Sequence, residues 1–316
     1  MAYAIEAHGL HKSFQTHEAV CGVDLAIRQG ELFALLGPNG AGKTTTIHML
    51  TTLLLPDRGS AHICGYDVVH DAAAVRRHIS VTGQFAALDE SLTGMQNLML
   101  FAELHGYNRK EARMLAEKLL ESFNLVNAGG KTVGNYSGGM RRRLDLAAGV
   151  LSQPKVMFLD EPTTGLDPQS RRELWDVVRR LVNNGTTVLL TTQYLEEADQ
   201  LADRIGFIAA GKIIAVGTPE QLKESIGGKM LTIRLKEGSD PADICRLIES
   251  EYGLEAHMDD NGSIVKLVAG EAILAHKVIG TLLDQSAMIE DFTLSEPILD
   301  DVYFALTANN GKESGS

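Results

Sequence analysis

GPNGAGKT, residues 37–44, is the stretch that decides the fold of this 316-residue chain. It matches the spacing G-x-x-x-x-G-K-[ST] at every fixed position. The apolar run before it, ELFALL at residues 31–36, is typical of a buried strand, and a helix is predicted from Gly42 to about Leu54. The sequence therefore predicts a phosphate-binding loop between a strand and a helix.

Each residue type in this loop has a physical role. Glycines let the backbone turn tightly so that successive N–H groups face phosphate oxygens, and the helix N-terminus adds positive potential. Lys43 supplies a cation for the terminal phosphates, and the hydroxyl of Thr44 is a ligand for Mg²⁺. The residues expected to contact a nucleotide here are Gly37, Pro38, Asn39, Gly40, Ala41, Gly42, Lys43, Thr44 and Thr45.

A second apolar run supplies the carboxylates that such a loop needs. VMFLDE, residues 156–161, is predicted to be a buried strand that ends in Asp160 and Glu161. Ligands of open α/β sheets bind at the carboxyl ends of the strands. We therefore expect Asp160 to hold Mg²⁺ and Glu161 to polarise an attacking water as a general base.

A further anion site is predicted far along the chain, in NYSGGMRRRLDL at residues 135–146. Ser137 is a favourable N-cap residue, and Gly138 and Gly139 expose the N–H groups of a first helical turn. Arginines at 141–143 place cations nearby. Taken alone, this pattern is a weak signal, and an ordinary helix N-cap followed by a Gly-Gly turn is then the favoured interpretation.

These motifs, followed by VMFLDEPTTGLDP and TTQYLEEADQLADR, resemble the nucleotide-binding subunit of an ABC transporter over about residues 4–222. The resemblance implies an ATPase that acts as a dimer, either of two copies of this chain or of this chain with a sister ATPase. In that family two subunits bind head to tail, and each ATP lies between the phosphate loop of one subunit and the Ser-Gly-Gly helix of the other. The two anion sites of one chain would then serve two different nucleotides.

The resemblance assigns roles to four further residues. Phe14 matches the aromatic residue that stacks on adenine, and Gln84 matches the glutamine that contacts Mg²⁺ and reports the state of the site to the membrane partner. Asp167, in the Gly-Leu-Asp turn, matches the loop that crosses the dimer interface. Gln193 occupies the position of a histidine that contacts the γ-phosphate, so it cannot carry the charge that histidine can.

The chain also departs from the usual signature, Leu-Ser-Gly-Gly-Gln. Tyr136 and Met140 replace its two end residues, while the Ser-Gly-Gly core remains. We expect ATP hydrolysis to be retained, because Glu161 and the core of the signature are present.

The subfamily suggested by VTGQFAALDESLTGMQNL and SEPILDDVYFALT is that of the daunorubicin-resistance-type exporters. Such ATPases power a separate multi-span permease that exports drugs, polyketides or lipids, and glutamine is usual there at the position of Gln193. The alternative is an ABC ATPase that acts on ribosomes or nucleic acid. A net charge of −12, a single cassette and the absence of Cys pairs disfavour that alternative, and we expect no nucleic-acid partner.

The predicted fold class is an α/β P-loop NTPase cassette followed by a small α+β ferredoxin-like domain. We expect the cassette at residues 1–225, with a helical subdomain at about 88–150, the second domain at 226–308 and a disordered tail at 309–316. Residues 226–316 carry 7 Lys and Arg against 16 Asp and Glu, and this shift in composition marks the boundary. We interpret this acidity as a solvated face.

The expected location is the cytoplasmic face of the cell membrane, with the protein attached peripherally. No window approaches the ~18 uninterrupted apolar residues of a membrane span, and no signal peptide is recognised. Three widely spaced cysteines suit a reducing compartment. The permease contact is predicted in the helical insert at about residues 91–125 and just before it, where Phe85, Leu88, Leu92 and Met95 are expected to be exposed.

Overall fold

The computed structural model describes residues 2–83, 87–236, 238–259, 262–285 and 287–313. The chain divides into two compact units, Met1–Thr218 and Pro219–Ser316. The boundary expected after residue 225 therefore lies seven residues further along than the division in the structure. The intervening helix α8 (Pro219–Glu224) belongs to the second unit.

The first unit is built around a six-stranded sheet in the order β10-β9-β3-β8-β7-β6. All neighbouring strands are parallel except the pair β9 and β10. The three central strands are entirely buried, as the apolar run in each of them predicts. The strands are β3 (Leu32–Leu36), β6 (Ile79–Thr82), β7 (Val156–Asp160), β8 (Thr187–Thr192), β9 (Arg204–Ala209) and β10 (Lys212–Gly217).

A second, antiparallel sheet accompanies this core and has the order β2-β1-β4-β5. It contributes side chains to the same buried cluster as α1 and β3, so the phosphate loop lies beside a continuous hydrophobic core. Its strands are β1 (Tyr3–Phe14), β2 (His17–Arg28), β4 (Arg58–Ile63) and β5 (Tyr66–Asp67). The helices that belong to the two sheets are α1 (Lys43–Leu50), α2 (Ala72–His78), α6 (Pro168–Asn183) and α7 (Leu195–Leu201).

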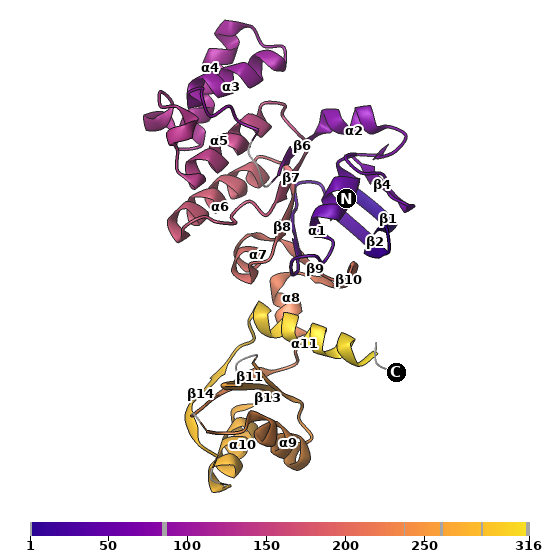
Figure 1. Ribbon diagram of the computed structural model, residues 1–316, viewed down its shortest axis with the longest axis vertical. Coiled ribbons are helices and arrows are strands. Elements are labelled where there is room, and N and C mark those ends of the chain that lie inside the picture. The colour runs from indigo at the N-terminus through magenta and orange to yellow at the C-terminus, as the bar shows by residue number, and fades with distance from the viewer. Residues whose placement is uncertain (1, 84–86, 237, 260–261, 286, 314–316) are drawn as a thin grey trace. The chain divides into compact units, whose positions relative to one another are not determined.

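A helical region extends from the sheets, as Figure 1 shows for α3, α4 and α5. It consists of α3 (Gly94–Leu104), α4 (Arg109–Ser122), two short 3-10 turns (Val126–Ala128 and Val133–Asn135) and α5 (Gly138–Val150). The first two helices begin at capping boxes, Thr93 with Gln96 and Asn108 with Glu111. These caps fix the starts of α3 and α4 within the helical insert that the sequence predicts.

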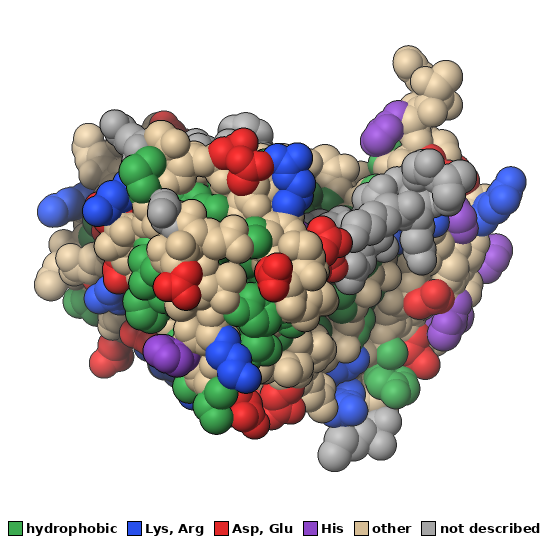
Figure 2. Space-filling model, turned by 90° about the horizontal axis from the view of Figure 1, so that it is seen from below, with side chains coloured by type: hydrophobic (Ala, Val, Ile, Leu, Met, Phe, Trp, Pro, Cys, Tyr) green, Lys and Arg blue, Asp and Glu red, His purple; other side chains and the backbone are tan. Residues whose placement is uncertain are grey.

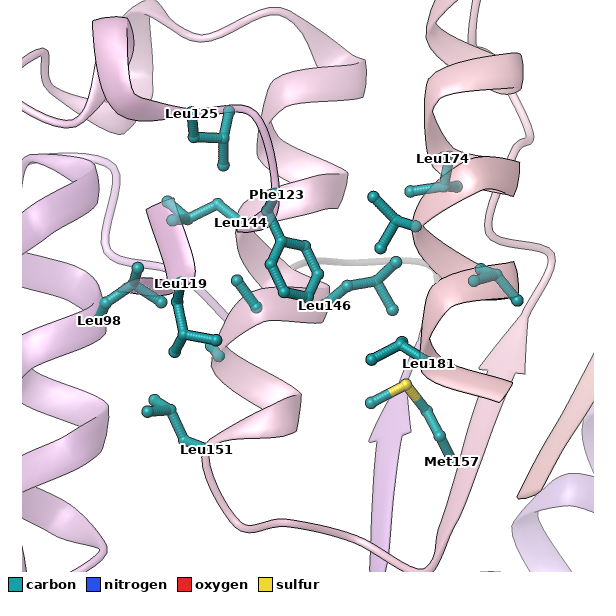
Figure 3. Packing of buried hydrophobic residues seen from close by; sticks show 14 of the residues in the cluster. Leu98, Leu119, Phe123, Leu125, Leu144, Leu146, Leu151, Met157, Leu174 and Leu181 are labelled. Atoms are coloured by element: carbon teal, nitrogen blue, oxygen red, sulfur yellow. The ribbon is translucent and has the colours of Figure 1, made fainter. Parts of the chain in front are cut away.

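The helical region shares one hydrophobic core with the carboxyl-terminal half of the cassette. Figure 3 shows Phe123, at the end of α4, between leucines of α5 and α6, with Met157 of β7 nearby. Because these side chains pack as one cluster, α5 is firmly attached to the strand that carries Asp160.

The second unit is an α+β fold with a four-stranded antiparallel sheet in the order β12-β13-β11-β14. That order and the succession β-α-β-β-α-β are those of a ferredoxin-like fold, as the sequence predicts. Its elements are β11 (Lys229–Leu235), α9 (Pro241–Tyr252), β12 (Ala256–Met258), β13 (Ile264–Gly270), α10 (Ala272–Asp284), β14 (Ile289–Ser295) and α11 (Leu299–Glu313).

The end of this unit differs from the expected disordered tail at 309–316. Helix α11 instead continues to Glu313. The composition of this segment did not reveal the helix, because local propensity is a weak guide to where a helix ends. Residues 314–316 lie outside the described residues. On the face shown in Figure 2, acidic side chains are spread among basic, hydrophobic and uncharged ones, which suits a solvated surface. Within the described ranges, no helix combines the length and the apolar character needed to cross a membrane.

Candidate active site

The loop between β3 and α1 is folded around the ammonium group of Lys43. Its Nζ donates to the carbonyl oxygens of Gly37 at 2.8 Å and of Pro38 at 2.9 Å. Gly42 has a φ of 103°, and a Cβ at this position would lie 2.5 Å from the carbonyl oxygen of Ala19, so only glycine fits. The lysine thus stabilises the turn whose N–H groups the sequence predicts to face phosphate.

Thr44 and Asp160 meet at the carboxyl end of the sheet. The hydroxyl of Thr44 donates to Asp160 Oδ2 at 2.9 Å, and the hydroxyl of Thr191 donates to Asp160 Oδ1 at 2.5 Å. Thr191 lies directly opposite Asp160 in the parallel pair of β7 and β8, which explains this contact. A hydroxyl and a carboxylate in contact are the oxygen ligands that Mg²⁺ prefers, so these residues fit the predicted metal position.

Glu161 follows Asp160 in a left-handed backbone conformation, with a φ of 47°. Its N–H donates to the carbonyl oxygen and the hydroxyl oxygen of Thr191, each at 3.1 Å. Its Oε1 lies 3.2 Å from Lys43 Nζ, and Thr164 donates to its Oε2 at 3.3 Å. The structure therefore brings the predicted base and the predicted phosphate-binding cation into direct contact.

A cavity of about 370 Å³ opens over this loop. It is lined by Asn39, Gly40, Gly42, Lys43, Thr44, Thr45 and Glu161, together with Phe14, His17 and Ala19 from the sheet β2-β1-β4-β5. Phe14 is 47% exposed, so its ring is available to stack on a flat base. His17 was missed by the sequence reasoning. His17 could have been found from the two-residue turn between β1 and β2, because this turn places His17 opposite Phe14 in the antiparallel pair.

Gln193 comes directly after β8, whose neighbours are β3 and β7. The N–H of Gly37 donates to the carbonyl oxygen of Thr192 at 3.2 Å, so the residue before Gln193 is tied to the start of the phosphate loop. The backbone thus places Gln193 at the same edge of the sheet as Lys43 and Asp160. The predictions for Gln84 and Phe85 fall on residues outside those that the structure describes.

The Ser-Gly-Gly turn forms the start of α5, as predicted. The Ser137 hydroxyl accepts a hydrogen bond from the N–H of Met140 at 3.2 Å, and Ser137 and Gly138 are exposed. Gly139 is buried, and a Cβ there would lie 2.6 Å from the side chain of Ser170. Asp167 caps α6 and accepts from the Ser170 hydroxyl at 2.7 Å, and the hydrogen bonds from Ser170 lower the pKa of Asp167.

The described lining of the cavity over the phosphate loop includes no residue from 137–139. The turn borders a different cavity, of about 530 Å³, with Gly138, Arg141 and Leu166 in its wall. Glu161 lines both cavities, but Lys43 and Thr44 line only the first and Gly138 lines only the second, so the phosphate loop and the Ser-Gly-Gly turn of one chain face different cavities.

The three arginines after this turn correct one expectation. Arg141 pairs with Glu90 at 3.0 Å, Arg143 pairs with Glu173 at 2.9 Å, and Arg142 is buried among backbone carbonyls. The expectation that they supply cations to a phosphate is wrong for Arg142 and Arg143, because both are buried and bound within the chain.

The expectation that the apolar side chains of Leu88, Leu92 and Met95 are exposed is also wrong. Leu88, Leu92 and Met95 are half-buried, and Leu88 and Met95 pack against the core of the helical region. Their apolar side chains complete that core. Within residues 91–125, the most exposed large apolar side chains are instead those of Leu104 and Met114, which are 72% and 62% exposed.

Comparison with known proteins agrees with this geometry. The sequence profile described as "ABC transporter" matches residues 20–164. The chain is 47% identical to the daunorubicin/doxorubicin resistance ATP-binding protein DrrA of Streptomyces peucetius over 306 residues, which cover 97% of this chain and 93% of that protein. The chain belongs to the ABC transporter family.

Other relatives support the same placement within the ABC transporter family. The doxorubicin resistance ATP-binding protein DrrA of Mycobacterium tuberculosis H37Rv is 45% identical over 97% of this chain and 94% of its own length. The Nod factor export ATP-binding protein I of Burkholderia orbicola is 43% identical, over 75% of this chain and 78% of its own length. The chain is thus the ATP-binding, ATP-hydrolysing subunit of an ABC exporter.

Solved ABC structures confirm the fold of the cassette. An ATP-binding subunit of an ABC transporter is 28% identical, with a TM-score of 0.63, and the match covers 71% of this chain and 93% of that chain. A subunit of an ABC transporter complex from Clostridium perfringens is 21% identical, with a TM-score of 0.66, and covers 80% of this chain and 97% of its own. The α/β P-loop fold predicted from GPNGAGKT is therefore confirmed.

Proposed function

We propose that this chain is the energising subunit of a daunorubicin-resistance-type exporter, which drives a separate multi-span permease that releases drugs, polyketides or lipids from the cell. The observation that carries the proposal is the 47% identity over 97% of the chain, second unit included. The match to the Nod factor export protein covers only 75% of the chain. The subunit would bind peripherally at the cytoplasmic face of the membrane.

The working form in this proposal is a dimer that encloses two ATP molecules head to tail. The separation of the two phosphate-binding surfaces in one chain supports it, because neither surface alone offers a complete set of groups for the γ-phosphate. Ser137, Gly138 and Asp167 would face the nucleotide held by the partner's phosphate loop. Two copies of this chain satisfy the arrangement, because both surfaces are intact.

The chemistry follows from the groups at the end of β7. A water molecule attacks the γ-phosphorus while Glu161 accepts its proton, and the bond to the bridging oxygen of ADP breaks. Lys43 and the loop N–H groups stabilise the negative charge that develops on the phosphate oxygens. Thr44, Asp160 and Gln84 would hold Mg²⁺, which neutralises phosphate charge when it is bound.

In this proposal the second unit regulates the ATPase or stabilises its dimer. Its core is made of apolar side chains from one sheet and two helices, which suits a binding module. No group of three or more His, Cys, Asp or Glu side chains suited to a metal occurs among the described residues.

The experiment that tests the proposal is an affinity pull-down of the full chain from gently solubilised membranes of its own host, with the recovered proteins identified by mass spectrometry. A stoichiometric multi-span partner supports the proposal. Recovery of ribosomal or nucleic-acid proteins without a membrane protein would contradict it. A Gly42→Asp chain, which cannot form the phosphate loop, shows whether capture depends on a folded cassette.

A further inference from the structure

The backbone of Glu161 is held in a conformation that side-chain-bearing residues rarely adopt. Its φ is 47°, and such a conformation persists only where the surroundings enforce it. The N–H of Glu161 is fixed by Thr191 on β8. The carbonyl groups of the residues on either side of Glu161 are fixed by a different element, the helix α5.

That helix contributes Arg142, whose guanidinium group lies across the Glu161 turn. Its Nη2 donates to the carbonyl oxygen of Asp160 at 3.1 Å, and its Nε donates to the carbonyl oxygen of Pro162 at 3.0 Å. Its Nη1 donates to the carbonyl oxygen of Gly83, just after β6. Arginine alone among the side chains offers a rigid planar set of donors for three acceptors at once.

Asp145, one turn along α5, completes the arrangement. Its Oδ2 lies 3.8 Å from Arg142 Nη1, and its Oδ1 accepts from the N–H of Ala87 at 3.2 Å. Both charged side chains are buried, so the cation would be costly without this partner. The pair therefore joins one turn of α5 to the backbone at Gly83, Ala87 and both sides of Glu161.

We propose that Arg142 is a positioning residue for hydrolysis, which keeps Glu161 in its left-handed conformation and ties that conformation to the position of α5. The first turn of α5 is the Ser-Gly-Gly surface, three residues before Arg142. Movement of that turn, when it binds the partner's nucleotide, changes the placement of the base in its own chain. This inference rests on the proposed role of Glu161 and on the proposed dimer.

The test compares single-turnover ATP hydrolysis and fluorescent-ATP binding by the full chain and its variants. Arg142→Met removes the three donors and keeps the bulk. Arg143→Met is the matched control, because Arg143 lies beside it on α5, is equally buried at 7% exposure, and contacts Glu173 and Gly139 instead. Arg142→Lys keeps the positive charge but not the planar set of N–H donors. This variant is measured in place of Arg142→Met if Arg142→Met does not fold.

The expected result is a loss of at least about tenfold in hydrolysis rate for Arg142→Met, with ATP affinity within about twofold, since a displaced base slows the chemical step and not binding. Arg143→Met should lose less than about threefold, because it leaves the Glu161 turn intact. In the Glu161→Gln background, Arg142→Met should cause no further loss, because the residue acts through Glu161.

Two results would overturn the inference while leaving the proposed function intact. One is an equal loss for Arg142→Met and Arg143→Met, and the other is a full additional loss from Arg142→Met when Glu161 is already Gln. If Glu161→Gln alone leaves hydrolysis unchanged, the assignment of the base fails first, and the inference fails with it.

Discussion

Lys43 Nζ and Glu161 Oε1 lie 3.2 Å apart, so the cation of the phosphate loop and the carboxylate after β7 form an ion pair. Both side chains are less than a tenth exposed, which makes the pair a buried one. Phosphate must compete with Glu161 for the lysine. Binding of ATP would therefore release the carboxylate at the moment when a base is needed.

Replacing Glu161 with Gln should separate binding from hydrolysis. The amide keeps the shape of the side chain but cannot accept the proton of water, so we expect hydrolysis to fall by roughly 10²- to 10⁴-fold. ATP binding should persist, because the Lys43 contacts to the loop carbonyls remain. Phosphate release and size-exclusion chromatography with ATP measure the two effects. The exposed acid Glu196 provides the control variant, Glu196→Gln, and an equal loss there would contradict the assignment.

Gln193 should contribute to the rate through one hydrogen bond rather than through charge. We expect Gln193→Ala to lower the hydrolysis rate by about tenfold, which corresponds to the loss of one hydrogen bond of about 1.4 kcal/mol. Gln193→His should retain activity and acquire a pH dependence in the range where imidazole titrates. Rate profiles between pH 5.5 and about 8 for the three proteins decide this point. A full rate for Gln193→Ala would exclude the residue from the reaction.

The sequence predicted the phosphate loop, the carboxylates at the carboxyl end of β7 and the helix start at Gly138 because each depends on local spacing. It did not predict the contacts that depend on how distant elements pack. The pair of Lys43 with Glu161 joins residues 118 positions apart, and the burial of Arg142 depends on α5 lying against the end of β7. A run of three arginines therefore suggested a charged surface where the fold uses two of them internally.

Tyr136 illustrates how a departure from the usual signature is accommodated. Its hydroxyl donates to the carbonyl oxygen of Ala128 at 2.7 Å in a buried position, and burial raises the pKa of this hydroxyl. Tyr136→Phe removes this donor, but the N–H of Lys131 still donates to the same carbonyl at 2.8 Å, so we expect a loss of about 0.5–1.5 kcal/mol in the free energy of unfolding. Urea denaturation of the two proteins measures it. Tyr107→Phe, at a half-buried tyrosine of the same region, is the control.

Glu197 should make stability depend on pH. Its burial raises the pKa of the carboxyl group, against an opposing hydrogen bond from Trp175 Nε1 at 2.9 Å. A raised pKa means that the folded chain favours the protonated acid, so this contribution to stability is present below the unfolded pKa and is lost as pH rises through the folded one. Glu197→Gln should therefore raise Tm most near neutral pH and least in acid. Tm profiles against pH, with Glu196→Gln as control, test this, and a pH-independent difference would contradict it.

Mixing two inactive variants tests whether the two phosphate surfaces of one chain serve different nucleotides. Lys43→Ala disables the phosphate loop and Gly138→Asp disables the Ser-Gly-Gly turn, so every site in either homodimer has one defective half. In a mixed dimer of head-to-tail geometry, one site has both defects and the other has none.

An equimolar mixture refolded or co-expressed together should then recover roughly a quarter of the wild-type rate, because half of the dimers are mixed and each has one intact site. Phosphate release measures the recovery, and the same proteins mixed without subunit exchange provide the baseline. If each chain instead used its own Ser-Gly-Gly turn, mixing would restore nothing. Within one chain the phosphate loop and the Ser-Gly-Gly turn line different cavities, which is why we expect recovery.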